Sequence, residues 1–324
     1  MTRVAAKAIP QDVLAPPARS AIFLVLTVRD GDEAADTVRG VLGDVAALVR
    51  SVGFRIPEAG LSCVAGIGSD LWDRLYAAAP RPAHLHPFKA LTGTVPSVVT
   101  GVPHEAPSTA GDLLFHIRST RQDTCFELAR QLMVRLGEVV VAVDEVQGFR
   151  YYDERDLLGF VDGTENPGGA IAIDTVFVGE EDREFEGGSY VIVQKYLHDL
   201  DAWGKLTVEE QQLVVGRTKS DDIELPDDVK PANSHVAANT IVDADGNEQR
   251  IVRENMPFGS PGAGEFGTLF CGYAADPGIT ELMLHRMFIG EPEGNYDRIL
   301  DFSRAVTGCN FFVPTASFLE DQAD

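Results

Sequence analysis

Three short stretches contain residue types that could do acid–base or metal chemistry. The first, GFVDGTENP (159–167), holds Asp162 in a tight turn directly behind two apolar residues. Gly163 accepts a positive φ at little cost and Asp can hydrogen-bond its own backbone, so the DG pair by itself indicates only a turn. A carboxylate fixed beside apolar residues could also act as a general base in a pocket. Both interpretations stay open at this point.

The second stretch, PANSHVAANTI (231–241), contains His235 among small, uncharged residues. Small neighbours such as Ala237 and Ala238 leave room for a large flat ligand to approach the imidazole. The sequence therefore favours His235 over the other six histidines as a ligand-binding residue.

The third stretch, RIVRENMPFG (250–259), follows closely along the chain. Arg253 and Asn255 are two residues apart, which predicts that they share one face of a short strand while Glu254 points the other way. A buried Arg and Asn could be structural. A pocket that combines them with His235 and Asp162 is nevertheless the default hypothesis for an active site.

Composition limits the classes of partner. The chain has 324 residues and a formal net charge of -23, spread along its length. Nucleic acids and anionic membranes are therefore excluded as partners, because binding them requires Lys and Arg to displace counterions. No long apolar run or signal-like segment is present in the sequence, which predicts a cytoplasmic protein.

Cysteine spacing excludes several kinds of site. The four cysteines lie far apart and form no CxxC or CxxCH motif, and they are Cys63, Cys125, Cys271 and Cys309. Zinc sites of the usual spacing, a thioredoxin motif and covalent haem attachment are thereby excluded. Buried, reduced thiols are the simpler interpretation, and they agree with a cytoplasmic location.

Hydrophobic periodicity in the first half predicts the elements that must position these residues. Strand-like and helix-like segments alternate in the order βαββαβ, at residues 21–28, 32–52, 61–68, 112–119, 124–136 and 138–149. This order is typical of the ferredoxin-like fold, in which two helices cover one face of an antiparallel sheet.

The second half repeats part of this pattern. Offset by 156 positions, residues 111–133 align with residues 267–289, and in both copies a strand runs into an amphipathic helix. We therefore expect an α+β protein built from a duplicated module. The expected divisions are a flexible arm over 1–20, an N-terminal ferredoxin-like domain over 21–150 and a C-terminal one over 151–324.

Taken together, the three stretches resemble the dye-decolorizing peroxidases, specifically their compact B-type members. GFVDGTENP, SHVAANT and RENMPFG occur in the order and at the spacing of that family. GDLLFHIRS (111–119) and NYDRILDFSRAVTGCNFFVP (295–314) match its pattern too, so the resemblance covers most of the chain. It implies two ferredoxin-like modules with non-covalent haem b in the second.

The resemblance also implies roles for single residues. His235 would be the proximal ligand of the haem iron, with Asp162, Arg253 and Asn255 on the distal face. Gly163 would let the backbone pass close to the porphyrin edge. Asp162 would move the proton of bound peroxide, and Arg253 would stabilise the developing negative charge and keep Asp162 ionised.

A carboxylate that accepts the second ring N–H of His235 would tune the proximal ligand. NYDRILDF supplies two candidates, Asp297 as first choice and Asp301 as second, and spacing alone does not separate them. Either residue could instead simply cap or solvate a helix.

The function implied is a peroxidase that reduces hydrogen peroxide and oxidises an organic, dye-like reductant one electron at a time. The alternatives are a haem-binding or haem-handling protein with little turnover, and a haem-free hydrolase or lyase that uses Asp162 and His235. A homo-oligomer is expected. Packaging in an encapsulin shell is expected only if a native C-terminal targeting tail is missing from this sequence, because SFLEDQAD contains no such tail after Phe318 and Leu319.

Overall fold

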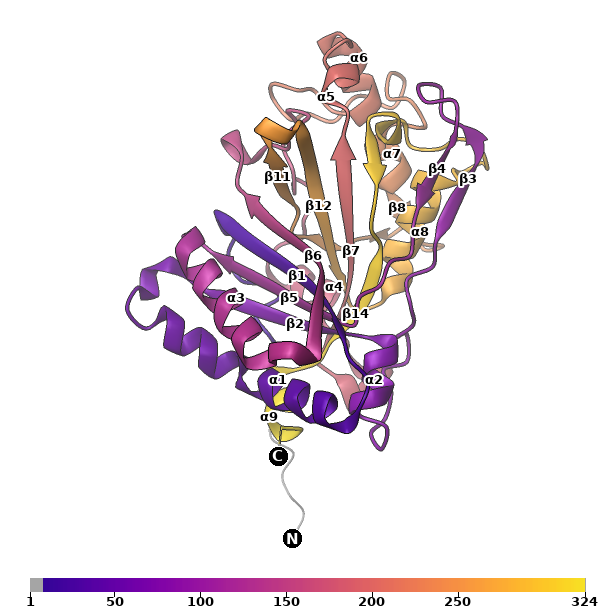
Figure 1. The fold of residues 1–324 in the computed structure, drawn as a ribbon. Helices are drawn as coiled ribbons and strands as arrows, with labels where there is room; N and C mark the ends of the chain where they lie inside the picture. The colour runs from indigo at the N-terminus through magenta and orange to yellow at the C-terminus, as the bar shows by residue number, and fades with distance from the viewer. Residues whose placement is uncertain (1–7, 324) are drawn as a thin grey trace.

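The computed structural model describes residues 8–323. Its main feature is a ten-stranded antiparallel sheet with the central order β10-β12-β7-β14-β2-β5-β1-β6, in which β11 also pairs with β12 and β13 with β7. Figure 1 shows the N-terminal strands in one half of this sheet and the C-terminal strands in the other. The predicted α+β architecture is confirmed.

The first module contains all six predicted elements. They are β1 (Ser20–Val28), α1 (Asp32–Gly53), β2 (Ser62–Gly68), β5 (Leu113–Ser119), α3 (Gln122–Leu136) and β6 (Val140–Phe149). Their strand order, β2-β5-β1-β6, is that of a ferredoxin-like sheet. Between β2 and β5 the chain adds α2 (Ser69–Leu75) and a separate hairpin of β3 (Leu91–Pro96) and β4 (Pro103–Ala106).

The second module has the same topology, with β7, β10/β11, β12 and β14 as its four strand positions. Its elements, after α4 (Gly169–Val176), are β7 (Ser189–His198), α5 (Leu200–Trp203), α6 (Val208–Val215), α7 (His235–Asn239), β8 (Ile241–Val242), β9 (Glu248–Gln249), β10 (Val252–Arg253), β11 (Met256–Ser260), β12 (Glu265–Ala274), α8 (Pro277–Phe288), β13 (Ser303–Ala305), β14 (Cys309–Val313) and α9 (Ala316–Asp321). The predicted repeat thus corresponds to equivalent elements, β5 with α3 and β12 with α8.

The two modules join edge to edge, because β14 pairs with β2. At the other end of the sheet β6 packs against β11, so closely that a Cβ added at Gly148 would come within 2.5 Å of the Cβ of Met256. The sheet therefore curls around an apolar core that both modules share, with Phe23 and Leu114 from the first and Leu269 and Phe311 from the second.

Helices cover the opposite face of the sheet. Helix α1 begins after Gly31 and places its apolar residues on one side, including the buried Val38 and Leu42. Asp32 and Glu33 in its first turn and Arg50 in its last turn suit the helix dipole. Helix α1 packs beside α3 over β1, β2 and β5, as Figure 1 shows. The spacing of the apolar residues was enough to predict this face.

The N-terminal segment differs from the expected flexible arm. Residues 1–7 of that arm lie outside the described part of the chain. In the rest, Val13 is fully buried in the shared core, and the side chain of Gln11 donates to the carbonyls of Ala65 and Pro314 and accepts from the N–H of Ala65. A buried Val and a side-chain amide with three hydrogen bonds hold this segment on the sheet, despite the prolines around it.

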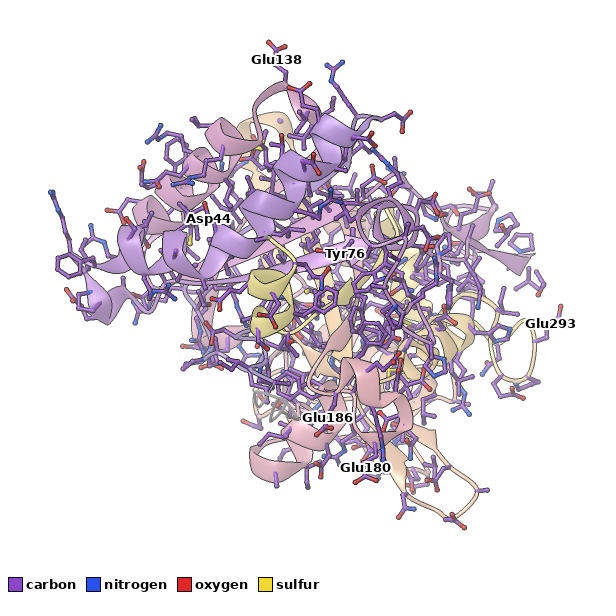
Figure 2. The ribbon with its side chains drawn as sticks, turned by 90° about the horizontal axis from the view of Figure 1, so that it is seen from below. Asp44, Tyr76, Glu138, Glu180, Glu186 and Glu293 are labelled. Atoms are coloured by element: carbon purple, nitrogen blue, oxygen red, sulfur yellow. The ribbon has the colours of Figure 1, made fainter. Side chains whose placement is uncertain are left out.

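The negative charge is distributed over the surface. Figure 2 labels five exposed carboxylates, Asp44, Glu138, Glu180, Glu186 and Glu293; Glu180 and Glu186 lie near each other and the other three lie apart from them and from one another. Within residues 8–323, no helix is both long and apolar enough to cross a membrane.

Candidate active site

One cavity of the second module brings together the four residues that the sequence singled out. It lies against β7 and β12 on one side and α7 and α8 on the other, and Asp162, His235, Arg253 and Asn255 all line it. Most of the remaining wall is apolar, from side chains such as Leu158, Phe160, Ile251, Phe270, Met283 and Met287. An adjoining polar cavity shares Asp162, His235 and Arg253 and adds Gly163.

His235 is the first residue of α7. The helix begins there because Ser234 caps it, accepting a hydrogen bond from the N–H of Ala237. The Nδ1 atom of His235 lies 2.6 Å from Oδ2 of Asp297, a carboxylate with no solvent exposure. Asn239, one turn later, donates to the carbonyl of His235 and to the same carboxylate. Among the described residues Nε2 of His235 makes no hydrogen bond, so it is available to a ligand.

Asp301 has a different set of partners. Its carboxylate accepts from Ser97 Oγ at 2.7 Å and from Tyr296 Oη at 3.0 Å, and it lies 3.4 Å from Nε2 of His104. Burial disfavours its charge, but these hydrogen bonds outweigh burial and lower its pKa. Asp301 therefore ties the β3–β4 hairpin to the second module, and Asp297 is the carboxylate that contacts His235.

The DG turn places Asp162 in the cavity wall. Gly163 has φ of +80°, a value that L-residues rarely adopt, and the N–H of Asp162 donates to the carbonyl of Glu154. One carboxylate oxygen of Asp162 accepts from Nδ2 of Asn255 at 3.2 Å. Among the described residues Asp162 and Arg253 form no ion pair, so the contact with Asn255 is what holds the carboxylate.

The strand expected to carry Arg253 and Asn255 is interrupted between them. β10 ends at Arg253 and β11 begins at Met256. At the interruption the N–H of Glu254 donates to the carbonyl of Cys271, and Oδ1 of Asn255 accepts from the N–H of Cys271 at 3.2 Å. Arg253 and Asn255 still both face the cavity, because the side chain of Asn255 takes the place of a backbone partner.

Asn166 is a site residue that the sequence reasoning missed. It belongs to the GFVDGTENP turn, and its side chain binds the backbone of Arg253 twice. Its Oδ1 accepts from the N–H of Arg253 at 2.9 Å, and its Nδ2 donates to the Arg253 carbonyl at 2.8 Å. Asn166 thus acts as a short strand partner for Arg253. The guanidinium Nε of Arg253 is buried and has no partner among the described residues.

Asp156 is a second missed residue of the cavity wall. Its carboxylate accepts from the N–H of Phe160 at 3.0 Å, in the turn that precedes Asp162. Burial and then the nearby charge of Asp162 raise the pKa of Asp156 to about 7, against the backbone N–H groups that lower it. The sequence did contain a signal for Asp156, which is the first residue of DLLG (156–159), directly before the motif with Asp162. A carboxylate six residues before Asp162 can lie across the turn from it.

A partly buried histidine also reaches the cavity. His198, at the end of β7, lies 2.8 Å from Ser303 Oγ through Nδ1 and 2.9 Å from Thr268 Oγ1 through Nε2. Burial lowers its pKa to about 4. With both ring nitrogens occupied by hydroxyls, His198 is a neutral structural residue of the wall.

The residues present suit a haem group. The long apolar walls match a porphyrin, the free Nε2 of His235 is an iron ligand of the kind haem proteins use, and its Nδ1 has the carboxylate partner typical of a metal-bound imidazole. The buried, unpartnered Nε of Arg253 offers a donor to an anionic ligand in the same cavity.

Comparison with known proteins identifies the family. The family model described as "Dyp-type peroxidase, N-terminal" matches residues 10–150, and "Dyp-type peroxidase, C-terminal" matches residues 153–318. The dye-decolorizing peroxidase of Rhodococcus erythropolis is 56% identical over 321 residues, which are 99% of this chain and 91% of that protein. That of Mycobacterium tuberculosis is 57% identical over 311 residues, 96% of this chain and 90% of the relative.

Solved structures agree. DyPB from Rhodococcus jostii RHA1 has a TM-score of 0.92 and 56% identity, covering 98% of this chain and 99% of its own. Variants of that protein are known in complex with heme. The encapsulated DyP-type peroxidase from Mycobacterium smegmatis also has a TM-score of 0.92 and 56% identity, with coverage of 97% and 98%. These matches confirm the predicted fold and the predicted haem-dependent peroxidase activity. The chain belongs to the Dyp-type peroxidase family.

Proposed function

We propose that the chain reduces hydrogen peroxide at a haem b held non-covalently by His235, and then oxidises an organic reductant one electron at a time. The observation that supports this most is the cavity in which a carboxylate-bound His235 and the set of Asp162, Arg253 and Asn255 meet. Haem, when bound, supplies the iron at which the O–O bond of peroxide is cleaved.

Each side chain has a task that follows from its contacts. Asp162, held by Asn255, would take the proton from one peroxide oxygen and return it to the other. Arg253 would stabilise the negative charge that develops on the departing oxygen, because its guanidinium is permanently charged and its Nε is buried without a partner among the described residues. Asp297 would hold the Nδ1 proton of His235 and keep Nε2 directed at the iron. Gly163 would let the backbone approach the porphyrin edge.

We also propose the division into two ferredoxin-like domains set out from the sequence, with the boundary between residues 150 and 151. The two family models, which match on either side of this position, support it. The haem would belong to the second module, since every residue that lines the cavity falls between 156 and 303.

The location and partners are proposals of the same kind. Four buried free thiols support a reducing, cytoplasmic environment. We propose a homo-oligomer that uses peroxide and an aromatic, dye-like reductant, without nucleic acid or membrane partners. Packaging in an encapsulin shell is proposed only for a form of the chain that carries a targeting tail; the relative from Mycobacterium smegmatis is described as encapsulated.

Titration of the haem-free protein with hemin tests the proposal. The parent should give one Soret band at one equivalent, His235→Ala should bind far more weakly, and added imidazole should restore the band of the variant. His285→Ala, at an exposed histidine of α8, is the matched control and should behave as the parent. Equal binding by His235→Ala and the parent would contradict the assignment. A haem carrier without turnover would give the Soret band but no spectral change with peroxide.

A further inference from the structure

An ion pair between the buried Arg118 and the partly buried Glu254 connects the first module to the residues of the cavity. Arg118, on β5, is 1% exposed, and its Nη1 lies 3.2 Å from Oε2 of Glu254. Side chains alternate along β5, so Leu113 and Phe115 face the helix-covered core while Leu114 and Arg118 face the core shared by the two modules. The charge of Arg118 therefore lies inside the curled sheet, away from solvent.

Glu254 occupies the interruption between β10 and β11, with Arg253 before it and Asn255 after it. Its N–H is bound to the carbonyl of Cys271 at 2.8 Å, and the side chain of Asn255 is bound to the N–H of the same residue. The side chain of Glu254 points away from the cavity, towards Arg118. A rotation of the backbone that displaced Glu254 would therefore also turn Arg253 and Asn255 out of the cavity.

Arg118 is itself held from a second direction. Its guanidinium donates to the backbone carbonyls of Asp12 and Val13 in the N-terminal segment, the latter at 3.3 Å from Nη1. Val13 is fully buried, so these acceptors are fixed. The guanidinium links three separate parts of the chain, which are the N-terminal segment, β5 and the interruption at Glu254.

Stability alone is a poor explanation for this arrangement. A fully buried charge paired with a partly buried one is costly to desolvate, and replacing such a pair by apolar residues of similar size is often neutral or stabilising. Removing only one partner, in contrast, leaves an uncompensated charge and is strongly destabilising. The feature that the pair adds is a fixed direction for Glu254.

We propose that Arg118 and Glu254 are positioning residues, which make the first module part of the active site by fixing the orientation of Arg253 and Asn255. The proposal rests on the proposed function for the catalytic roles of those two residues. It does not depend on that function for the claim that the pair fixes the backbone at the interruption.

The test uses the double variant Arg118→Met/Glu254→Leu, which removes both charges together and so avoids an unpaired charge. The haem-free variant should show faster amide hydrogen exchange over residues 251–258, with exchange over β7 unchanged. The haem-loaded variant should react with hydrogen peroxide on the order of 10- to 100-fold more slowly, as expected for displaced catalytic groups. Its KM for the organic reductant should stay the same.

Leu128→Ala is the matched control. It removes a buried side chain from α3 in the first module, facing away from the shared core, and should lower thermal stability without changing the rate with peroxide. Should the double variant fail to fold, Glu254→Asp, which keeps both charges but withdraws the carboxylate from Arg118, serves for the same measurements.

Unchanged exchange over 251–258 together with a parental rate constant would overturn the proposal. The proposal would also be overturned if the double variant and Leu128→Ala, compared at equal thermal stability, reacted with peroxide at the same rate. If Arg253→Leu slows the reaction and the double variant does not, only the positioning role fails. If the parent itself does not react with peroxide, the proposed function fails, whereas the exchange measurement still decides whether the pair fixes the backbone.

Discussion

The imidazole of His235 and the carboxylate of Asp297 lie 2.6 Å apart, in a pair that joins α7 to the 3-10 helix Arg298–Asp301. The other carboxylate oxygen of Asp297 accepts from the N–H of Ile299 at 2.9 Å, so the acceptor is fixed by the start of that helix. A fixed carboxylate on Nδ1 sets the tautomer of the ring and makes Nε2 a stronger ligand.

Asp297→Asn should weaken haem binding or peroxide turnover by about 10- to 100-fold, because the imidazole loses its carboxylate partner. The ferric reduction potential should rise in the same variant, and a spectroelectrochemical titration measures it. Asp301→Asn is the control, since Asp301 binds Ser97 and Tyr296 instead. A similar change of potential in both variants would show that proximity to His235 is not the cause.

Asn166→Ala removes both hydrogen bonds to the backbone of Arg253. Leaving a partly buried N–H and carbonyl unpaired should cost about 1–3 kcal/mol of stability. The kcat/KM for peroxide should fall on the order of 10-fold as Arg253 shifts. Steady-state kinetics at varied peroxide, with KM for the reductant as internal control, provide the measurement. Asn247→Ala, in an exposed turn, should leave both quantities unchanged.

Gly163→Ala tests the backbone of the DG turn. An added Cβ would meet only the side chain of Asn166, with Nδ2 at an ordinary 3.4 Å, so the cost comes from the positive φ and should be about 1–2 kcal/mol. Relief of this strain would move Asp162, and the peroxide reaction should slow. Gly262→Ala, where nothing lies within 4 Å and φ is ordinary, is the control in chemical denaturation. Equal stability of the two variants would contradict the strained-turn account.

The raised pKa of Asp156 predicts that the stability of the protein depends on pH. Its pKa is raised from the usual 3.8 to about 7 in the folded protein, so the folded state prefers the protonated form. The contribution of protonated Asp156 to the free energy of unfolding is therefore fully present below about pH 4 and is lost as pH rises through 7. Asp156→Asn should therefore gain roughly 1–3 kcal/mol relative to the parent between pH 5 and pH 8, measured by urea unfolding of the haem-free protein. Asp153→Asn, at an exposed position, should show no such trend.

The sequence predicted the first module well, because its strands are β-rich runs and its helices have a clear apolar period. The β-rich run of 21–28 and the apolar face of 32–52 match β1 and α1 within one residue. The second module was harder to divide, because its site residues stand in short elements and turns. The five-residue α7 and the two-residue β10 are too short to show any period.

The reactive residues of the site were predictable from the sequence, but the residues that hold them in place were not. Asp162, His235, Arg253 and Asn255 were recognisable by their types and motifs, and the structure brings them to one cavity. Asn166 was missed because Asn is common in turns, so the sequence does not show that its side chain binds the backbone of a distant residue. The choice between Asp297 and Asp301 depended on distances between parts of the chain more than fifty residues apart, which sequence spacing does not define.

The most direct test of the account mixes the haem-loaded parent and Arg253→Leu with one equivalent of hydrogen peroxide and follows the Soret band by stopped flow. The account predicts a rapid shift in the parent and a shift on the order of 100-fold slower in the variant, because the variant lacks the charge that stabilises the departing oxygen. Equal rates in the two proteins would contradict the role of Arg253. A Soret band that ignores peroxide in both would leave a haem-binding protein without peroxidase turnover.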